Sequence, residues 1–423
     1  MSRKRRWAFG AVFAVLLAIV TLVGIEFLSS FHTPNWPAVA LRSVPPGNPV
    51  TSENRPFSKQ PWIAERYNSW GMRDAERTVA KPAGGPPRVV FVGDSFVESM
   101  FTPLSLPADV ARQSEAAGHP IEAINLGVGA TDTRSYYYRV NDVALKLSPD
   151  AVAVFIYAGN DFVAANAGYT LWPALVDESP GGAVVGSIMP RTNWLLVNRL
   201  RLSGLLSGDL PPPDEGQLLH DYARLPNDQA LTRLVAHLKR YYYSELPEEK
   251  IREVIGRGDG RFWRAAQDNP AEQEYLFNWE LGILMSWEAR EFDVAKNRED
   301  APRLTGDGEV RATLSWIEGM DRLARARGVP LVVFLIPVGI VDPDYVDFWK
   351  PWPRAFSWNY ISDERQSRLA AALGKAKVNY VDLREDLNGV PGTYRKLDGH
   401  WSKKGEEIVA ARVTKELGKL FGQ

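Results

Sequence analysis

The chain has 423 residues, of which 45% are hydrophobic and 24% charged, a balance typical of a folded protein with enough apolar surface for a core. Its formal net charge of −1 provides no basic field for nucleic acid, and the sequence contains no nucleic-acid motif. The absence of cysteine excludes disulfides, thiolate zinc sites and a cysteine nucleophile. Because no two of the five histidines are spaced like metal ligands on one element, we predict neither a metal nor a cofactor.

The first 31 residues have the pattern of a membrane anchor. A basic cluster at positions 3–6 precedes an apolar run over 7–25, which as a helix would reach about 28 Å, enough for the hydrocarbon core of a bilayer. The cationic flank predicts a single-pass inner-membrane protein whose N-terminus is cytoplasmic and whose remaining chain is periplasmic. A cleavable signal peptide is the alternative, but the residues after the run offer no clean Ala-x-Ala site, so an uncleaved anchor is favoured.

The rest of the chain divides by composition. Prolines recur from 34 to 61, which predicts an extended tether, and regular strand patterns begin only near residue 88. The predicted parts are an anchor (1–31), a proline-rich tether and turn (32–84), a first part of the catalytic domain (85–165), a mostly helical insertion or cap (166–309) and a second part of the domain (310–423).

Buried strands alternate with helices on both sides of the insertion. The expected strands are 89–92, 121–125, 151–157, 330–336 and 378–382. The expected helices are 107–118, 132–147, 231–243, 274–292, 310–327, 362–375 and 403–420, the last capped by Ser402. This alternation implies right-handed parallel crossovers and a doubly wound α/β sheet. The tryptophans at 349, 352 and 358, in an expected proline-rich loop, are interpreted as packing residues rather than sugar-stacking ones.

Ser95 follows the first buried strand directly. In open α/β sheets ligands bind at the carboxyl ends of the strands, so Ser95 is a candidate nucleophile. Such a serine needs a base and an acid that orients the base, and the chain offers His400 and Asp398 just before its last helix. Asp94 is expected to cap the turn beside the serine, and Asp161 is expected to be structural.

The oxyanion formed by serine attack needs hydrogen-bond donors. The candidates are the amide of Ser95, an amide of the loop containing Gly129 and Ala130, and the side chain of Asn160. All of them lie in predicted loops that follow strands, so one edge of one sheet could bring them together.

In this order and context, these blocks resemble the SGNH, or GDSL-type, hydrolase superfamily over roughly residues 88–161 and 310–423. The resemblance implies a flavodoxin-like three-layer α/β/α parallel sheet and a serine esterase or acyltransferase. The chain departs from the family where Ala158 takes the place of a glycine in the third block, and Gly129 or Ala130 matches the second-block glycine depending on alignment.

The spacing of the last block is a second departure. The superfamily usually has Asp-x-x-His, whereas this chain has Asp398-Gly399-His400-Trp401, which resembles the alginate-type polysaccharide O-acetyltransferases. That resemblance implies a carbohydrate substrate and a membrane-bound acyltransferase partner that donates the acetyl group.

The leading hypothesis is therefore an anchored, extracytoplasmic serine O-acyltransferase or esterase that acts on O-acetyl groups of a polysaccharide through an acyl-enzyme. Transfer to a sugar hydroxyl and transfer to water both remain open. The alternatives are a lysophospholipase-like lipid esterase and a non-catalytic polysaccharide-binding or assembly protein on the same fold.

Overall fold

The computed structural model describes residues 3–29, 68, 70–99, 101–129, 131–163, 218, 221–222, 224–241, 243–267, 281–289 and 294–422. The chain divides into two compact units. One contains α1 (Arg3–Ser29), and the other contains the sheet and the remaining helices named below.

Five parallel strands form one sheet in the order β2-β1-β3-β4-β5. They are β1 (Arg88–Gly93), β2 (Glu122–Gly127), β3 (Ala151–Tyr157), β4 (Leu331–Ile336) and β5 (Tyr380–Asp382). Every residue of β1 and β4 is buried, as expected for strands covered on both faces. The order is that of a flavodoxin-like sheet, which confirms the predicted architecture and places the topological switch point between β1 and β3.

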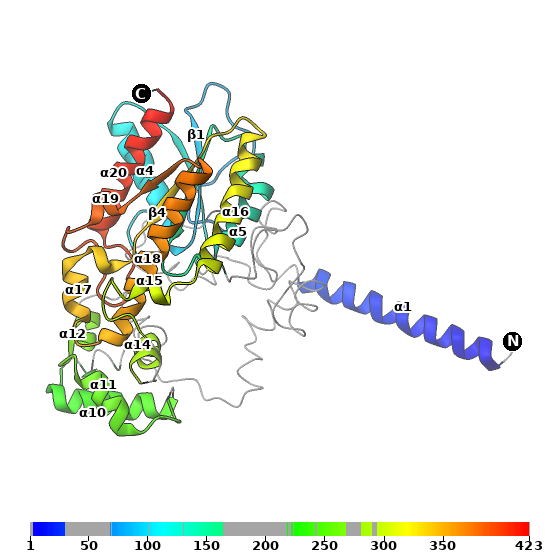
Figure 1. Cartoon of the computed structure of the whole chain (residues 1–423). Coiled ribbons are helices and arrows are strands. Elements are labelled where there is room, and N and C mark those ends of the chain that lie inside the picture. The colour runs from blue at the N-terminus through cyan, green and yellow to red at the C-terminus, as the bar shows by residue number, and fades with distance from the viewer. Residues whose placement is uncertain are drawn as a thin grey trace. The chain divides into compact units, whose positions relative to one another are not determined.

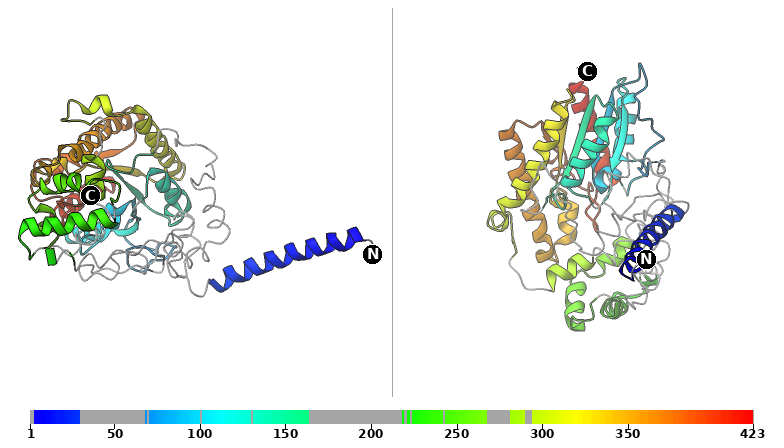
Figure 2. Two further views of the ribbon diagram at one scale, coloured as in Figure 1. Left: turned by 90° about the horizontal axis from the view of Figure 1, so that it is seen from below. Right: turned by 90° about the vertical axis from the view of Figure 1, so that its right-hand side faces the viewer.

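Helices cover both faces of the sheet (Figures 1 and 2). On one face α4 (Leu106–Ala116) contacts α20 (Lys403–Leu420). On the other face α16 (Asp307–Arg325) contacts both α5 (Thr133–Asp142) and α18 (Pro353–Ala376). The core follows this layering, since Val89 and Phe91 of β1 belong to one buried apolar cluster with residues of α4 and α20.

Two predicted elements have the bounds expected for them. β3 covers 151–157 and α20 covers 403–420, and the Ser402 side chain caps α20 by accepting the Gly405 amide at 3.2 Å. The caps of α4 and α5 are also side chains: Ser105 accepts the Ala108 amide, and Asp132 accepts the Ser135 amide. Local capping chemistry therefore sets where these helices begin.

The prediction of a proline-rich loop before residue 362 is wrong, because this segment is helical. α17 (Pro343–Trp349) and α18 both begin with proline, and α18 starts nine residues before the predicted helix. Proline suits the first helical position because its missing N–H would have no partner there, so these prolines start helices instead of preventing them. The helix predicted over 132–147 is shorter than expected. The α-helix α5 ends at Asp142, and the 3-10 helix η1 (Ala144–Lys146) follows it.

Trp349 and Trp352 of this segment are core residues, as expected, whereas Trp358 is only partly buried. The Trp349 indole donates to the carbonyl of Lys396 at 2.8 Å, and the Trp352 indole donates to the carbonyl of Val254 at 2.7 Å. Both side chains are buried. Their polar atoms are satisfied by backbone, which is the usual arrangement for a buried indole.

The described part of residues 166–309 is mostly helical. It contains α10 (Asn227–Tyr241), α11 (Glu248–Gly256), α12 (Arg261–Gln267), α14 (Leu281–Glu288) and α15 (Ala301–Leu304). α10 starts four residues before the helix expected at 231. The domain boundary expected at 165/166 lies outside the described residues, whereas residue 310 lies inside α16.

The predicted membrane anchor coincides with α1, a helix of 27 residues. Several of its large apolar side chains, Phe13 and Leu17 among them, are more than half exposed. Within the part of the chain that the structure describes, no helix is long and apolar enough to cross a membrane.

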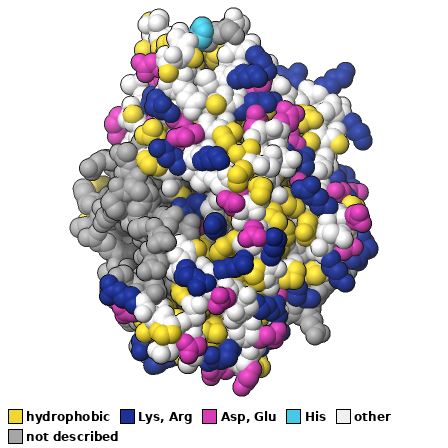
Figure 3. Space-filling model, turned by 90° about the vertical axis from the view of Figure 1, so that its left-hand side faces the viewer, with side chains coloured by type: hydrophobic (Ala, Val, Ile, Leu, Met, Phe, Trp, Pro, Cys, Tyr) yellow, Lys and Arg dark blue, Asp and Glu magenta, His cyan; other side chains and the backbone are white. Residues whose placement is uncertain are grey.

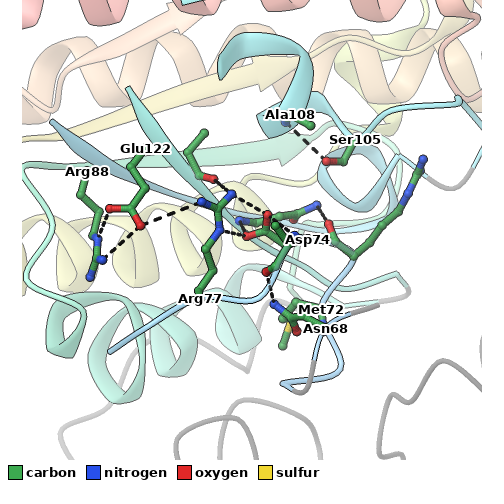
Figure 4. A network of polar contacts seen from close by, with 12 residues as sticks. Asn68, Met72, Asp74, Arg77, Arg88, Ser105, Ala108 and Glu122 are labelled. Carbon is green, nitrogen blue, oxygen red and sulfur yellow. Dashed lines mark hydrogen bonds and ion pairs between the residues drawn. The ribbon is translucent and has the colours of Figure 1, made fainter. Parts of the chain in front are cut away.

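Ion pairs join the segment before β1 to the sheet (Figure 4). Arg77 lies 2.7 Å from Asp74 and 3.9 Å from Glu122, which also pairs with the fully buried guanidinium of Arg88 at 2.8 Å. These contacts fix the approach of the chain to its first strand. The surface seen in Figure 3 mixes both signs of charge over its described part.

Arg73, in the same segment, contacts the stretch of chain that follows β1. Its buried guanidinium donates to four carbonyls, those of Glu98, Ser99, Thr102 and Pro103. The segment 98–103 directly follows Ser95 along the chain, so Arg73 fixes the backbone behind the candidate nucleophile.

Replacing Arg73 with alanine should lower the free energy of unfolding by about 3 kcal/mol or more, because buried carbonyls would lose their donors. Urea unfolding monitored by circular dichroism would measure this. Arg325→Ala is the control, since Arg325 is 62% exposed and its ion pair with Asp321 should contribute about 1 kcal/mol or less. Equal stability of the two variants would contradict the assigned role of Arg73.

Candidate active site

Ser95 lies at the carboxyl end of β1, beside the switch point. It is the first residue of the short helix α3 (Ser95–Glu98), and the Asp94 side chain caps this helix by accepting the Phe96 amide at 2.9 Å. The helix ends at Ser99, whose φ of 55° is left-handed. The prediction that Asp94 caps the turn is confirmed. This sharp turn holds Ser95 at the end of the sheet, with 7% of its surface exposed.

The loop before α20 brings His400 to this serine. His400 Nε2 lies 2.7 Å from Ser95 Oγ, although 305 positions separate the two residues in the sequence. On the other side of the ring, His400 Nδ1 lies 3.3 Å from Asp398 Oδ2. At this distance the two atoms can form an ion pair, but they do not form a hydrogen bond. The three side chains thus stand in the order hydroxyl, imidazole and carboxylate, which is the order that serine catalysis requires.

The Asp398 carboxylate is buried but well supported. Its Oδ1 accepts the His400 amide at 3.0 Å and the Arg395 Nε–H at 3.3 Å. Burial acts to raise the pKa of Asp398, but the charges of Arg395 and His400, together with the hydrogen bond from the His400 amide, outweigh burial, so the pKa is lowered. Asp398 is therefore an anion that can orient a histidine and stabilise its protonated form.

Aromatic rings hold the imidazole in place. The His400 ring stacks on Phe96 with centroids 4.7 Å apart, and Phe101 lies against it at 4.8 Å. The Arg395 guanidinium lies over the Phe101 ring at 4.1 Å. These contacts restrict the rotation of the base, a requirement for proton transfer at fixed geometry.

The predicted oxyanion donors do not converge on one point as clearly as Ser95, His400 and Asp398 do. The Gly129 amide donates to the buried carboxylate of Glu98 at 2.8 Å, so it would have to exchange this partner for an oxyanion. Asn160 is exposed in the turn after β3, and Ala130 lies outside the described residues. The roles of Gly129, Ala130 and Asn160, and of the Ser95 amide, stay predictions.

Asp161 has structural contacts, as predicted. Its Oδ2 accepts the Tyr157 amide at 2.6 Å, and its carbonyl accepts the Thr133 hydroxyl at 2.7 Å. Burial and the charge of Asp94 raise the pKa of Asp161 well above its usual range. These bonds join the end of β3 to the start of α5.

A small pocket lies beside Ser95 and His400. Its lining consists of Ser95, Phe96, Ser99, Phe101, Thr102, His400, Trp401 and Glu406. Glu406, in the first turn of α20, is 5% exposed, and its Oε2 lies 2.9 Å from the Thr102 hydroxyl. Burial raises the pKa of Glu406 to about 8, with Ser99 and Thr102 opposing the shift, so this carboxyl is protonated at neutral pH.

Glu406 should therefore make stability depend on pH. Between the unfolded pKa of about 4.3 and the folded value of about 8, the folded chain holds a proton that the unfolded chain has lost, so stability falls as pH rises. Glu406→Gln should remove this fall, and its stability relative to wild type should rise by up to about 4 kcal/mol from pH 5 to pH 8. Urea unfolding at both pH values would measure the change. A difference that does not vary with pH would contradict a buried, protonated Glu406.

Sequence reasoning missed Arg395, Phe101 and Glu406. Glu406 carried a usable signal, because it lies at helical spacing with Val409 and Val413 on the apolar side of α20, where an acidic residue is unexpected. Arg395 and Phe101 lie in loops, where no periodicity marks a buried side chain. In the described part of the chain, no group of three or more metal-ligating side chains is placed to hold a metal ion.

Comparison with known proteins gives a distant structural likeness only. No family model matches the chain, and no curated protein matches it. A GDSL-like lipase from Bacteroides thetaiotaomicron aligns at 11% identity and a TM-score of 0.31, covering 79% of this chain and 88% of its own. A lipase/acylhydrolase from Enterococcus faecalis aligns at 12% identity and a TM-score of 0.33, covering 78% of this chain and 95% of its own. At these values the likenesses assign neither a family nor a function to the chain.

Proposed function

We propose that the chain is a serine esterase or O-acyltransferase of the SGNH type. The observation that carries the proposal is the 2.7 Å contact between Ser95 Oγ and His400 Nε2, with the Asp398 carboxylate behind the imidazole. Its place at the switch point of a flavodoxin-like sheet supports the proposal, because ligands bind there in folds of this type.

The proposed reaction has two halves. Ser95 Oγ attacks the ester carbonyl carbon while its proton passes to His400 Nε2, and the carbonyl oxygen becomes an oxyanion. The carbon–oxygen bond to the leaving group then breaks, and His400 returns the proton to the departing oxygen. A hydroxyl of an acceptor, deprotonated by His400, repeats the steps on the acyl-enzyme and releases Ser95.

The proposal also names the acyl group that is transferred and the acceptor that receives it. The Asp398-Gly399-His400-Trp401 spacing favours acetyl groups and a carbohydrate hydroxyl, with water as the competing acceptor. A membrane-bound acyltransferase would supply the acetyl group, a partner suggested by that spacing alone.

Membrane attachment through the N-terminal segment completes the proposal. It is supported by the cationic cluster and the apolar run that follows it in the sequence. Carbonate extraction of membranes from cells that express the full chain would test it, and release of the protein into the carbonate wash would contradict an integral anchor.

The decisive experiment incubates the purified full chain with a small acetyl ester, with and without a panel of oligosaccharides, followed by mass spectrometry. Acetylated sugar that requires both Ser95 and His400 would establish transfer, and free acetate with the same requirement would establish hydrolysis. A fluorophosphonate should also form an adduct on Ser95. Absence of that adduct in folded protein would overturn the proposed function.

A further inference from the structure

The turn that carries Asp398 and His400 is closed by the backbone of Arg395. The Arg395 amide donates to the His400 carbonyl at 2.8 Å, and the Arg395 carbonyl accepts the Gly399 amide at 3.3 Å. Gly399 has a left-handed φ of 72°, which glycine adopts at little steric cost. The position of Arg395 is therefore fixed directly against the two residues that serve the imidazole end of the site.

The Arg395 side chain folds back over the same turn. Its Nε–H donates to Asp398 Oδ1 at 3.3 Å, whereas Asp398 Oδ2 faces His400 Nδ1 at 3.3 Å. Each carboxylate oxygen thus has its own partner. The side chains of Arg395 and Asp398 are 6% and 1% exposed, so solvent screens their attraction little. Because Arg395 holds Oδ1, the carboxylate keeps Oδ2 towards the imidazole.

The same guanidinium supports the imidazole by a second route, through Phe101. It lies over the Phe101 ring at 4.1 Å, and the centroid of that ring is 4.8 Å from the centroid of the His400 ring. A guanidinium is planar, so it can direct an N–H to a carboxylate and place its face on an aromatic ring at once. Both contacts of Arg395 therefore end at groups that touch His400.

Arg395 also supplies positive charge beside a buried carboxylate. Asp398 faces Arg395 and His400 in its own turn and Tyr157 at the end of β3. Burial raises the pKa of Tyr157 well above its usual range and the charge of Asp398 adds to the shift, so Tyr157 is neutral at neutral pH. Of these three groups only Arg395 is a permanent cation. Without it, burial would raise the pKa of Asp398, which would take up a proton at higher pH.

Given the proposed function, we infer that Arg395 is a positioning residue of this site, whose guanidinium turns the Asp398 carboxylate towards His400 and, through Phe101, fixes the plane of the imidazole. It acts through these neighbours and does not need to touch the reacting atoms. Arg395 would then control both the rate of the reaction and the pH range over which Ser95 is active.

The test is the pH dependence of p-nitrophenyl acetate hydrolysis by the full chain. Arg395→Gln keeps a hydrogen-bond donor but loses the charge and the planar guanidinium. It should lower kcat about 100-fold with little change in KM, because the imidazole would no longer be held in place. It should also move the acid limb of kcat/KM to higher pH by about one unit, because Asp398 would be protonated at higher pH.

Arg395→Lys separates charge from shape. Lysine keeps the positive charge, so the acid limb should stay where it is in wild type. Its ammonium group cannot serve the carboxylate and the Phe101 ring together, so kcat should fall about tenfold. A merely structural role would lower the stability of both variants and leave both acid limbs in the wild-type position.

Arg412→Gln is the matched control. The Arg412 side chain is also largely buried, at 19% exposed, and it forms ion pairs with Glu385, Asp386 and Glu416 rather than with the turn that carries His400. This variant should keep the wild-type kcat and acid limb even if its stability falls.

The inference and the proposed function can fail separately. A wild-type kcat and acid limb in folded Arg395→Gln, with fluorophosphonate labelling at Ser95, would overturn the inference and leave the proposed function intact. If Arg395→Gln does not fold, Arg395→Lys decides, and a wild-type kcat in that variant would overturn the inference. Folded wild-type protein that neither hydrolyses the ester nor takes the label would overturn both.

Discussion

Ser95→Ala should abolish fluorophosphonate labelling and lower kcat for acetyl ester hydrolysis by about 10⁴-fold or more. The reason is that the hydroxyl 2.7 Å from His400 is the only proposed nucleophile, and without it no acyl-enzyme can form. Residual activity would come from direct attack of water helped by the remaining groups. Intact-protein mass spectrometry after labelling, together with initial rates, would measure both effects.

The Ser95 side chain is small and its loss should leave the fold unchanged. Ser315→Ala, on α16 at the other face of the sheet, is the matched control and should retain wild-type labelling and rates. Labelling of the Ser95→Ala variant at another residue, with activity retained, would mean that the nucleophile has been misassigned.

Asp398→Asn should lower kcat by about 10⁴-fold while leaving KM and the folded structure largely unchanged. The carboxylate Oδ2 stands 3.3 Å from His400 Nδ1, so its charge can orient the imidazole and stabilise the imidazolium formed when Ser95 attacks. An amide at this position has no charge and can hold the imidazole in the wrong tautomer. Steady-state kinetics with the acetyl ester would separate the effect on kcat from that on KM.

Asp363→Asn provides the comparison. Asp363 is also a poorly exposed carboxylate in ion pairs, 3.1 Å from Arg384 and 3.4 Å from Arg298, but it lies on α18 away from the triad. It should affect stability more than rate. If Asp398→Asn lost no more activity than Asp363→Asn, His400 would not depend on Asp398 as its orienting partner.

The strands were predictable because the physics that forms them is local. β1, β3 and β4 are largely apolar runs in which about half of the residues are β-branched, and a strand buried on both faces needs such a run. The start of α20 and its cap at Ser402 were predictable for a similar reason, since a serine side chain satisfies the first free amides of a helix. The proline-rich stretch around 343–353 was misjudged because proline is compatible with both a loop and the first turn of a helix.

The sequence by itself determined the sheet class and the three residues proposed to carry the chemistry, because Ser95, Asp398 and His400 stand next to recognisable strand and helix boundaries. Only the tertiary structure decided what surrounds them. The contact of Arg395 with Asp398, the Arg73 bonds behind Ser95 and the contact of Glu406 with Thr102 join segments that are hundreds of residues apart or lack any periodic pattern. Such contacts depend on how the layers pack, and packing is a property of the whole fold rather than of any local stretch.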